Sequence, residues 1–282
     1  MSSEQPRFAF FGTPAFAVFA LEELKKAKLP PALVVTAPDR PKGRGLRLSP
    51  PPVKTWAERE RIPFIQPEKL DEAAREKLAG FDLFAVVAYG KILKQEVLAL
   101  PKHGTLNVHP SLLPKLRGPS PVEGAILEGA RETGVSILLL DEKMDHGPVV
   151  MREKMLLSGD ERAPELREKL ARLGGSALAK VIPDGATGTL AAVAQDDAAA
   201  TYTNLVKKED GLLDLADAPE KNYRKFRAYC GSIGTHFFAK RHGKDVRVIV
   251  KDAALENGEF SIKKVLPEGG REMPYGDFVR GL

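Results

Sequence analysis

The first two-thirds of the chain alternates short apolar runs with segments of helical periodicity, and this alternation restricts the possible folds more than any other feature. The apolar runs are Arg7–Phe11, Leu33–Thr36, Phe64-Ile65, Leu83–Ala88, Thr105–Val108 and Val135–Leu140. Helical patterns occupy Pro14–Lys28, Pro52–Arg61, Asp71–Leu78, Pro121–Leu127 and Ala163–Val181, with Asp71 as an expected N-cap. Strands that alternate with helices predict an α/β fold with a doubly wound, mostly parallel sheet covered on both faces.

The last third of the chain has a different pattern. A stretch rich in glycine and alanine, from Pro183 to Ala200, indicates a linker. Beyond it lie a basic helical segment and short β-like runs, at Tyr223–Tyr229, Thr235–Ala239, Val246–Val250 and Phe260–Val265. Turns at His242-Gly243 and Asn257-Gly258 separate the runs, which favours a small β-barrel of OB-like type. We therefore expect domains at 1–185 and 205–282, joined by a linker at 186–204.

Composition excludes several classes of protein. With 43% hydrophobic residues, the chain can bury a core, but no apolar run approaches the roughly 18 residues that a membrane span requires. The N-terminus lacks the pattern of a secretion signal, and Cys230 is the one cysteine, so we expect a reducing, cytoplasmic location and no disulfide. The net charge of +5 is mild for this length and becomes informative only where the cations cluster.

The segment that follows the first strand reads Gly12-Thr13-Pro14-Ala15-Phe16. A dinucleotide-binding fingerprint would have three glycines here, and two of them are missing, so NAD or FAD binding is not expected. Gly12 either permits the turn into the helix or belongs to a loop that faces a substrate, because such sheets bind ligands at the carboxyl ends of their strands.

A basic segment, Asp39–Arg47, follows the second strand. Its glycines and prolines are too frequent for a helix, so we expect a mobile loop that carries Arg40, Lys42, Arg44 and Arg47. Charged loops are often merely solvated, but four cations beside the binding edge of a sheet also suit a phosphate backbone.

Polar side chains end the strand at Thr105–Val108. Asn107 and His109 lie two residues apart, so on an extended chain they point to the same side. An amide can donate to an oxyanion, and an imidazole can act as a base near neutral pH. Asp141 and Asp145 both follow the next strand, and either could orient the histidine. The chain has no G-x-S-x-G nucleophile motif and no histidine spacing typical of a metal site.

These residues together resemble the methionyl-tRNA formyltransferase family, which belongs to a larger group that uses 10-formyltetrahydrofolate. The shared features are Asn107-Val108-His109, Ser111-Leu112-Leu113-Pro114, Arg117-Gly118 and Asp145-His146-Gly147. The narrower assignment depends on FGTPAFA at Phe11–Ala17 and PDRPKGRG at Pro38–Gly45. The resemblance extends over nearly the whole chain, with a C-terminal segment shorter than is usual in the family.

The resemblance implies a Rossmann-like formyltransferase domain and a role for each motif. Asn107 and a protonated His109 would stabilise the formyl oxygen, and Asp145 would hold His109 and order a water that carries the proton. The folate would contact Ser111, Leu112, Leu113, Pro114, Ala88, Tyr89, Gly90 and Ile92. The methionyl group would lie at Gly12, Thr13, Pro14 and Phe16, and the acceptor stem would meet Arg40, Lys42 and Arg44. No metal and no covalent intermediate are required.

The expected activity is transfer of the formyl group of 10-formyltetrahydrofolate to methionine on initiator tRNA, by a monomer. One alternative is an N-formyltransferase that acts on an amino-sugar nucleotide, which would need a similar sheet but no basic loop and no tRNA-binding barrel. Another is a non-enzymatic domain with an RNA-binding tail, which would leave the same-face Asn107 and His109 unexplained.

Overall fold

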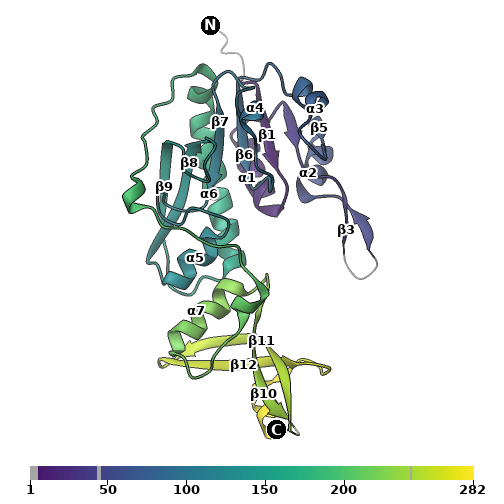
Figure 1. The fold of residues 1–282 in the computed structure, drawn as a ribbon, viewed down its shortest axis with the longest axis vertical. Helices are drawn as coiled ribbons and strands as arrows, with labels where there is room; N and C mark the ends of the chain where they lie inside the picture. Colours follow the sequence, from purple (N-terminus) through teal and green to yellow (C-terminus); the bar gives the residue numbers. More distant parts are fainter. Residues whose placement is uncertain (1–5, 43–45, 242) are drawn as a thin grey trace. The chain divides into compact units, whose positions relative to one another are not determined.

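β1 (Phe8–Gly12) is buried along its whole length, as expected for a strand that is covered on both faces. The computed structural model describes residues 6–42, 46–241 and 243–282, and in it β1 belongs to a seven-stranded sheet (Figure 1). The strand order is β5-β2-β1-β6-β7-β8-β9. The other strands are β2 (Leu33–Val35), β5 (Phe64–Ile65), β6 (Leu83–Val87), β7 (Thr105–His109), β8 (Glu132–Leu139) and β9 (Val149–Leu156).

The pairing within this sheet confirms the prediction of a mostly parallel arrangement. β2 pairs in parallel with β5 and with β1, β1 with β6, and β6 with β7, whereas β8 runs antiparallel to β7. β9 was not predicted. Its sequence, VVMREKML, mixes charged and apolar residues, and only Val149 is fully buried, so it lacks the continuous apolar run of the central strands.

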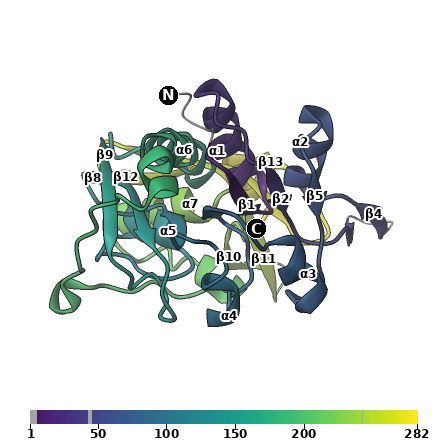
Figure 2. The same cartoon turned by 90° about the horizontal axis from the view of Figure 1, so that it is seen from above.

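Helices cover both faces of the sheet (Figure 2). α1 (Ala15–Lys26) and α6 (Ala163–Thr187) lie on one side. A hydrogen bond joins these two helices, from Arg172 Nη1 to Glu23 Oε1 at 3.2 Å. α3 (Glu72–Lys77) and α4 (Gln95–Leu98) lie on the other side and are joined by an ion pair between Arg75 and Glu96. α2 (Pro52–Glu60) packs against α1 and β2. This arrangement confirms the predicted doubly wound fold.

Alternate side chains of β1 pack into the hydrophobic layers on the two faces of the sheet. Ala9 and Phe11 pack with Leu78, Phe81 and Val97, which lie in and around α3 and α4. Because successive residues of a strand point to opposite faces, Phe8 and Phe10 point toward the other layer of helices. All of these side chains have a relative exposure of 3% or less, so the sheet is fixed from both sides.

The predicted linker is wrong in its first residues, because α6 continues through Pro183 to Thr187. Val181 and Ile182 are 2% and 0% exposed, and Gly185 lies so close to Leu83 that an added Cβ would be 3.0 Å from it. Packing of this last part of the helix on the sheet therefore overrides the helix-breaking tendency of Pro183 and Gly185.

The basic segment after β2 is more ordered than the loop we expected. β3 (Arg40–Lys42) and β4 (Arg47–Ser49) form an antiparallel hairpin, with Arg40 opposite Ser49 and Pro41 opposite Leu48. Arg44 lies outside the described residues, as does the side chain of Lys42.

The chain divides into two compact units, and the second comprises residues 118–132, 156–166 and 203–282. Its four-stranded antiparallel sheet has the order β10-β11-β12-β13. The elements are α5 (Pro121–Glu128), α7 (Pro219–Tyr229), β10 (Thr235–Arg241), β11 (Lys244–Glu256), β12 (Glu259–Pro267), β13 (Met273–Pro274) and α8 (Tyr275–Arg280). The helix and the three longer strands expected after residue 201 are thus confirmed, with extended bounds.

One face of α7 packs into the core of this second unit. Asn222, Phe226 and Tyr229 recur at helical spacing and are buried. Phe226 packs with Val248 of β11 and Val265 of β12 in the cluster that fills the unit. α5, which comes between β7 and β8 in the sequence, packs against α7. No helix among residues 6–42, 46–241 and 243–282 is both long and apolar enough to cross a membrane.

Asp71 caps α3, as the sequence predicts: its Oδ1 accepts a hydrogen bond from the Ala74 backbone N–H at 3.1 Å. Asp71→Ala removes that acceptor and is expected to lower the free energy of unfolding by about 1 kcal/mol. Urea denaturation measures the change, with Asp71→Ser as the control that keeps a capping oxygen. Equal stability of the alanine and serine variants would contradict the capping role.

Candidate active site

The end of β7 presents two polar side chains of the first compact unit. Asn107 pairs across the sheet with Leu138 and His109 with Ser136, both on β8. Since strand residues two apart share a face, the two side chains project to the same side. His109 is 4% exposed, whereas Asn107 is partly open and its carboxamide has no hydrogen-bond partner within the part of the chain that the structure describes. Asn107 therefore offers unused N–H donors beside a buried imidazole.

Both ring nitrogens of His109 face acceptors. Nε2 lies 2.9 Å from the Leu116 backbone carbonyl, which can only accept, so this nitrogen carries the hydrogen. Nδ1 lies 3.5 Å from Asp145 Oδ1. Only the protonated ring can donate to both at once. The contact with Asp145 is longer than the ~2.8 Å of a close charge-assisted hydrogen bond, which leaves room for it to tighten when substrates bind.

The hydrogen bonds in the structure distinguish Asn107 from His109 as possible donors to the formyl oxygen. The resemblance implies that both donate to the same formyl oxygen. In the structure the two nitrogens of His109 are engaged by Leu116 and Asp145, whereas Asn107 is open. Direct donation from His109 would require it to exchange one of these partners, so Asn107 is the donor that needs no rearrangement.

The segment Ser111–Pro114 is mostly turned inward. Ser111 is fully buried and its hydroxyl donates to the Lys115 carbonyl at 2.6 Å. Leu113 is 2% exposed and packs with Leu138 and Val149. Leu112 and Pro114 are partly exposed, and the Leu113–Pro114 peptide bond is cis. The surface that this segment can offer a folate is therefore made by Leu112 and Pro114, with Leu113 as its support.

The loop after β6 exposes backbone and one apolar side chain. Ala88 and Gly90 both have positive φ, at 49° and 81°, and both are exposed. Ile92 is 87% exposed. Tyr89 between them is 3% exposed, its ring packs edge-on against Phe11, and burial raises the pKa of its hydroxyl to about 12. The loop thus presents peptide groups and a large apolar side chain, while Tyr89 serves as an anchor.

The segment after β1 is tied to that loop, because the Thr13 hydroxyl donates to the Tyr89 carbonyl at 2.9 Å. A Cβ added to Gly12 would lie 2.6 Å from Ala17 Cβ and 2.7 Å from the Phe10 ring, so close packing requires the glycine. Pro14 is exposed at the N-cap of α1, and Phe16 is half-buried. The turn-forming interpretation of Gly12 has direct structural support; contact with a methionyl group stays a prediction.

The basic hairpin is anchored at its base. Asp39 Oδ1 accepts from Gln66 at 2.7 Å and its Oδ2 from Lys54 at 2.7 Å, and these hydrogen bonds lower the pKa of Asp39. Arg40 and Arg47 are exposed. Within the described part of the hairpin, two guanidinium groups are therefore available to a ligand.

Sequence reasoning missed three residues that hold this site. Ser136 on β8 accepts from the Leu113 N–H at 3.0 Å and donates to the Ser111 carbonyl at 2.7 Å. Thr201 accepts from the Leu116 N–H at 2.8 Å through its hydroxyl. Gln195 bonds the backbone around Asp145. The one available signal was that Gln195 interrupts an alanine-rich stretch, which the sequence analysis assigned to a linker.

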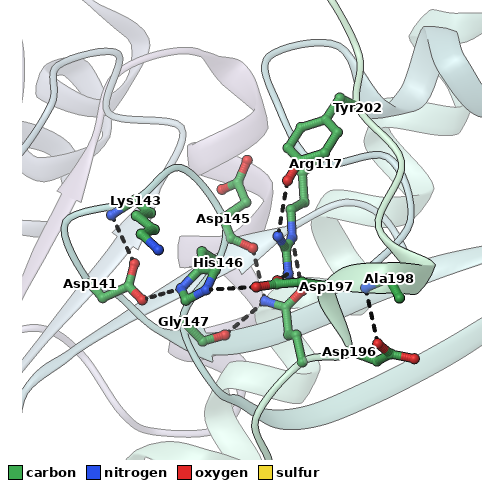
Figure 3. Close-up of polar contacts among 11 residues, drawn as sticks. Arg117, Asp141, Lys143, Asp145, His146, Gly147, Asp196, Asp197, Ala198 and Tyr202 are labelled. Atoms are coloured by element: carbon green, nitrogen blue, oxygen red, sulfur yellow. Dashed lines mark hydrogen bonds and ion pairs between the residues drawn. The ribbon is translucent and has the colours of Figure 1, made fainter.

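A metal site is not apparent in the described residues: 6–42, 46–241 and 243–282 contain no group of three or more His, Cys, Asp and Glu side chains that could hold an ion. His146, which follows Asp145, instead bonds Asp141 Oδ2 through Nδ1 at 2.6 Å (Figure 3). Asp141, the other carboxylate considered for His109, is thus engaged elsewhere, and Asp145 is the one in contact with His109.

Solved structures share this fold. A methionyl-tRNA formyltransferase from Clostridium thermocellum superposes with a TM-score of 0.62 at 16% identity, over 93% of this chain and 98% of that one. An N-formyltransferase from Helicobacter canadensis, solved with folinic acid and dTDP-3-aminofucose, has a TM-score of 0.63 at 17% identity, with 89% of each chain covered. At these identities the likeness shows the fold alone.

Sequence comparison is more specific. Residues 6–182 match the family model described as Formyl transferase, which supports a folate-derived formyl donor. A methionyl-tRNA formyltransferase from Chloroflexus aurantiacus is 43% identical over 95% of this chain and 87% of its own length. Because the matched model spans more than half of the chain and the relative nearly all of it, the chain belongs to the formyl transferase family, among the methionyl-tRNA formyltransferases.

Proposed function

We propose that this enzyme transfers the formyl group of 10-formyltetrahydrofolate to the α-amine of methionine carried by initiator tRNA. The observation that supports it most is the constellation at the end of β7: Asn107 has free donors, and the buried His109 contacts Asp145 at 3.5 Å. The full-length relatives are named for this activity. The expected monomeric state and cytoplasmic location stay predictions.

In the proposed reaction, the neutral amine attacks the formyl carbon on N10 of the folate, and the carbonyl oxygen becomes an oxyanion. Asn107 donates to that oxygen, a contribution of roughly 2.7–4 kcal/mol for one such donor. The amine must lose one proton, and N10 must gain one as its bond to the formyl carbon breaks. Asp145 orders the water that carries this proton, while His109 holds the carboxylate in place.

Two surfaces of the first unit suit the parts of the folate. Ile92, at 87% exposure, is an apolar side chain against which a flat ring can lie, and the exposed peptides at Ala88 and Gly90 can bond its polar edge. Leu112 and Pro114 offer further apolar contact. The second unit, with its antiparallel sheet, is proposed to bind more of the tRNA.

The proposal is tested by measuring formyl transfer from 10-formyltetrahydrofolate to charged initiator tRNA, with elongator tRNA and an amino-sugar nucleotide as alternative acceptors. Formylation of the initiator tRNA is the expected result. Transfer only to the sugar nucleotide would establish the alternative function, and RNA binding with no transfer would favour a non-enzymatic role.

The hairpin of β3 and β4 is proposed to contact the phosphates of the acceptor stem. Replacing Arg40, Lys42 and Arg44 by alanine should weaken tRNA binding and reduce the slope of log K against log salt by about 1 for each phosphate-binding cation removed. Folate binding should be unchanged. Alanine at three exposed lysines elsewhere in the first unit, Lys69, Lys77 and Lys180, is the matched charge control. An unchanged salt slope in the hairpin variant would contradict the phosphate contacts.

A further inference from the structure

Gln195 lies in the segment between α6 and the second unit, and its carboxamide makes four hydrogen bonds. Nε2 donates to the backbone carbonyls of Asp145 at 2.8 Å and Gly147 at 2.7 Å. Oε1 accepts from Arg117 Nε at 3.1 Å and Nη2 at 2.9 Å. A carboxamide has two N–H donors and one oxygen with two lone pairs, so every hydrogen-bonding site of Gln195 is used.

The turn that Gln195 bonds has an unfavourable backbone conformation. Asp145 has φ of +51°, which costs an L-residue about 1–2 kcal/mol. Gly147 passes so close to the Leu139 carbonyl that a Cβ there would lie 1.8 Å from it. The two carbonyls belong to the residues before and after His146, so the carboxamide of Gln195 holds the Asp145–His146 and Gly147–Pro148 peptide groups. Fixing the backbone of the turn fixes the direction of the Asp145 side chain.

Arg117 connects this turn to the other partner of His109. Its side chain is 2% exposed. Burial acts to lower the pKa of the guanidinium, but the hydrogen bonds to Asp197 and Tyr202 more than offset that effect and raise it (Figure 3). The preceding residue, Leu116, supplies the carbonyl that Nε2 of His109 bonds. Arg117 and Gln195 together therefore link the acceptor on one side of the imidazole to the carboxylate on the other.

The segment that carries Gln195 is itself fixed in place. The backbones of Val193 and Val149 exchange hydrogen bonds at 2.8 and 2.9 Å. Asp197 bonds Arg117 Nη2 at 2.8 Å and lies 3.4 Å from His146 Nε2, a second link to the same turn (Figure 3). Contacts at Val193 and Asp197 thus fix the chain before and after Gln195, so Gln195 can hold the turn in place.

We propose that Gln195 is a positioning residue for formyl transfer: it joins Arg117 to the Asp145 turn and so holds the Asp145 carboxylate against His109. It acts through Asp145 rather than on a substrate. This inference rests on the proposed function, because it assumes that the contact between His109 and Asp145 serves the reaction.

Gln195→Glu is the sharpest test, because glutamate keeps the length and the acceptors for Arg117 but cannot donate to the carbonyls of Asp145 and Gly147. We expect kcat to fall about 100-fold, the loss that a displacement of about 1 Å can cause, with both KM values within twofold of wild type. Asp196→Asn is the matched control, since asparagine can still accept from the Ala198 N–H, and it should keep wild-type kcat. Wild-type kcat in Gln195→Glu would overturn the proposal.

A double-mutant cycle separates positioning from a general structural effect. If Gln195 acts through Asp145, adding Gln195→Glu to Asp145→Asn should change kcat by less than twofold. A double variant whose loss of kcat equalled the product of the two single losses would overturn the proposal.

The ¹⁵N signals of the His109 ring give a readout that needs no substrate. Gln195→Glu should shift them in the same direction as Asp145→Asn, and an unshifted spectrum would overturn the proposal. If the wild-type enzyme failed to formylate methionyl-tRNA while these shifts appeared, the proposed function would fail, whereas the coupling of Gln195 to Asp145 and His109 would stand.

Discussion

Asn107→Ala is expected to lower kcat for formyl transfer by about 10²- to 10³-fold, the usual cost of losing one oxyanion donor. The physical reason is that its carboxamide is the donor at the end of β7 that no described residue engages, whereas the two nitrogens of His109 already face Leu116 and Asp145. KM should change little, because the charge on the formyl oxygen develops in the transition state. Rapid-quench measurement of a single turnover isolates the chemical step.

Thr105→Val is the matched control for this variant. Thr105 lies two residues earlier on the same face of β7, is 1% exposed, and its hydroxyl has no hydrogen-bond partner among the described residues. Valine has nearly the same shape, so both the free energy of unfolding and kcat should stay near wild type. Comparable turnover in Asn107→Ala and Thr105→Val would remove Asn107 from the mechanism.

Asp145→Asn should reduce kcat by about 10²- to 10⁴-fold, the range typical of a lost proton-transfer group. Asparagine keeps the shape of the side chain but not the charge that faces Nδ1 of His109 at 3.5 Å. His109→Ala should cause a loss of similar size. The combined variant should lose far less than the product of the two, because the side chains are in contact and act as a unit.

Glu142→Gln is the control for the loss of a carboxylate from the same turn, since Glu142 is exposed and lies three residues before Asp145. It should retain wild-type kcat, and thermal unfolding of all four proteins checks that the fold persists. If the loss of kcat in the combined variant equalled the product of the losses in His109→Ala and Asp145→Asn, the two side chains would act independently.

Much of the first unit could be predicted because its strands are buried on both faces. β1, β6 and β7 read as apolar runs, and the patterns of α1, α2 and α3 also place these helices within one or two residues of their observed bounds. β9 and the end of α6 escaped prediction for the opposite reason. β9 mixes charged with apolar residues and is only partly buried, and the final turns of α6 pack on Leu83, which is distant in sequence. α4 was not predicted, because its four residues are too few to show a period.

Asn107 and His109 could be predicted as a pair because two residues of one strand are related by a local rule. The choice of Asp145 over Asp141 could not be made from the residues themselves, since both follow β8 and are four positions apart. The resemblance favoured Asp145, and in the structure Asp141 bonds His146 while Asp145 contacts His109. The backbone of the intervening turn, with its positive φ at Asp145, makes the difference.

The sequence by itself determined the α/β order of elements, the Asn107 and His109 pair and the motifs of the family, because each of these depends on residues close together along the chain. Only the tertiary structure decided that Gln195, 50 residues beyond Asp145, bonds the turn that carries it, and that Arg117 is buried beside Asp197. Those contacts depend on the path of the long segment after α6, which bonds the backbone of β9 at Val149. Its path is set by many weak, distant interactions, and no local period in the sequence encodes it.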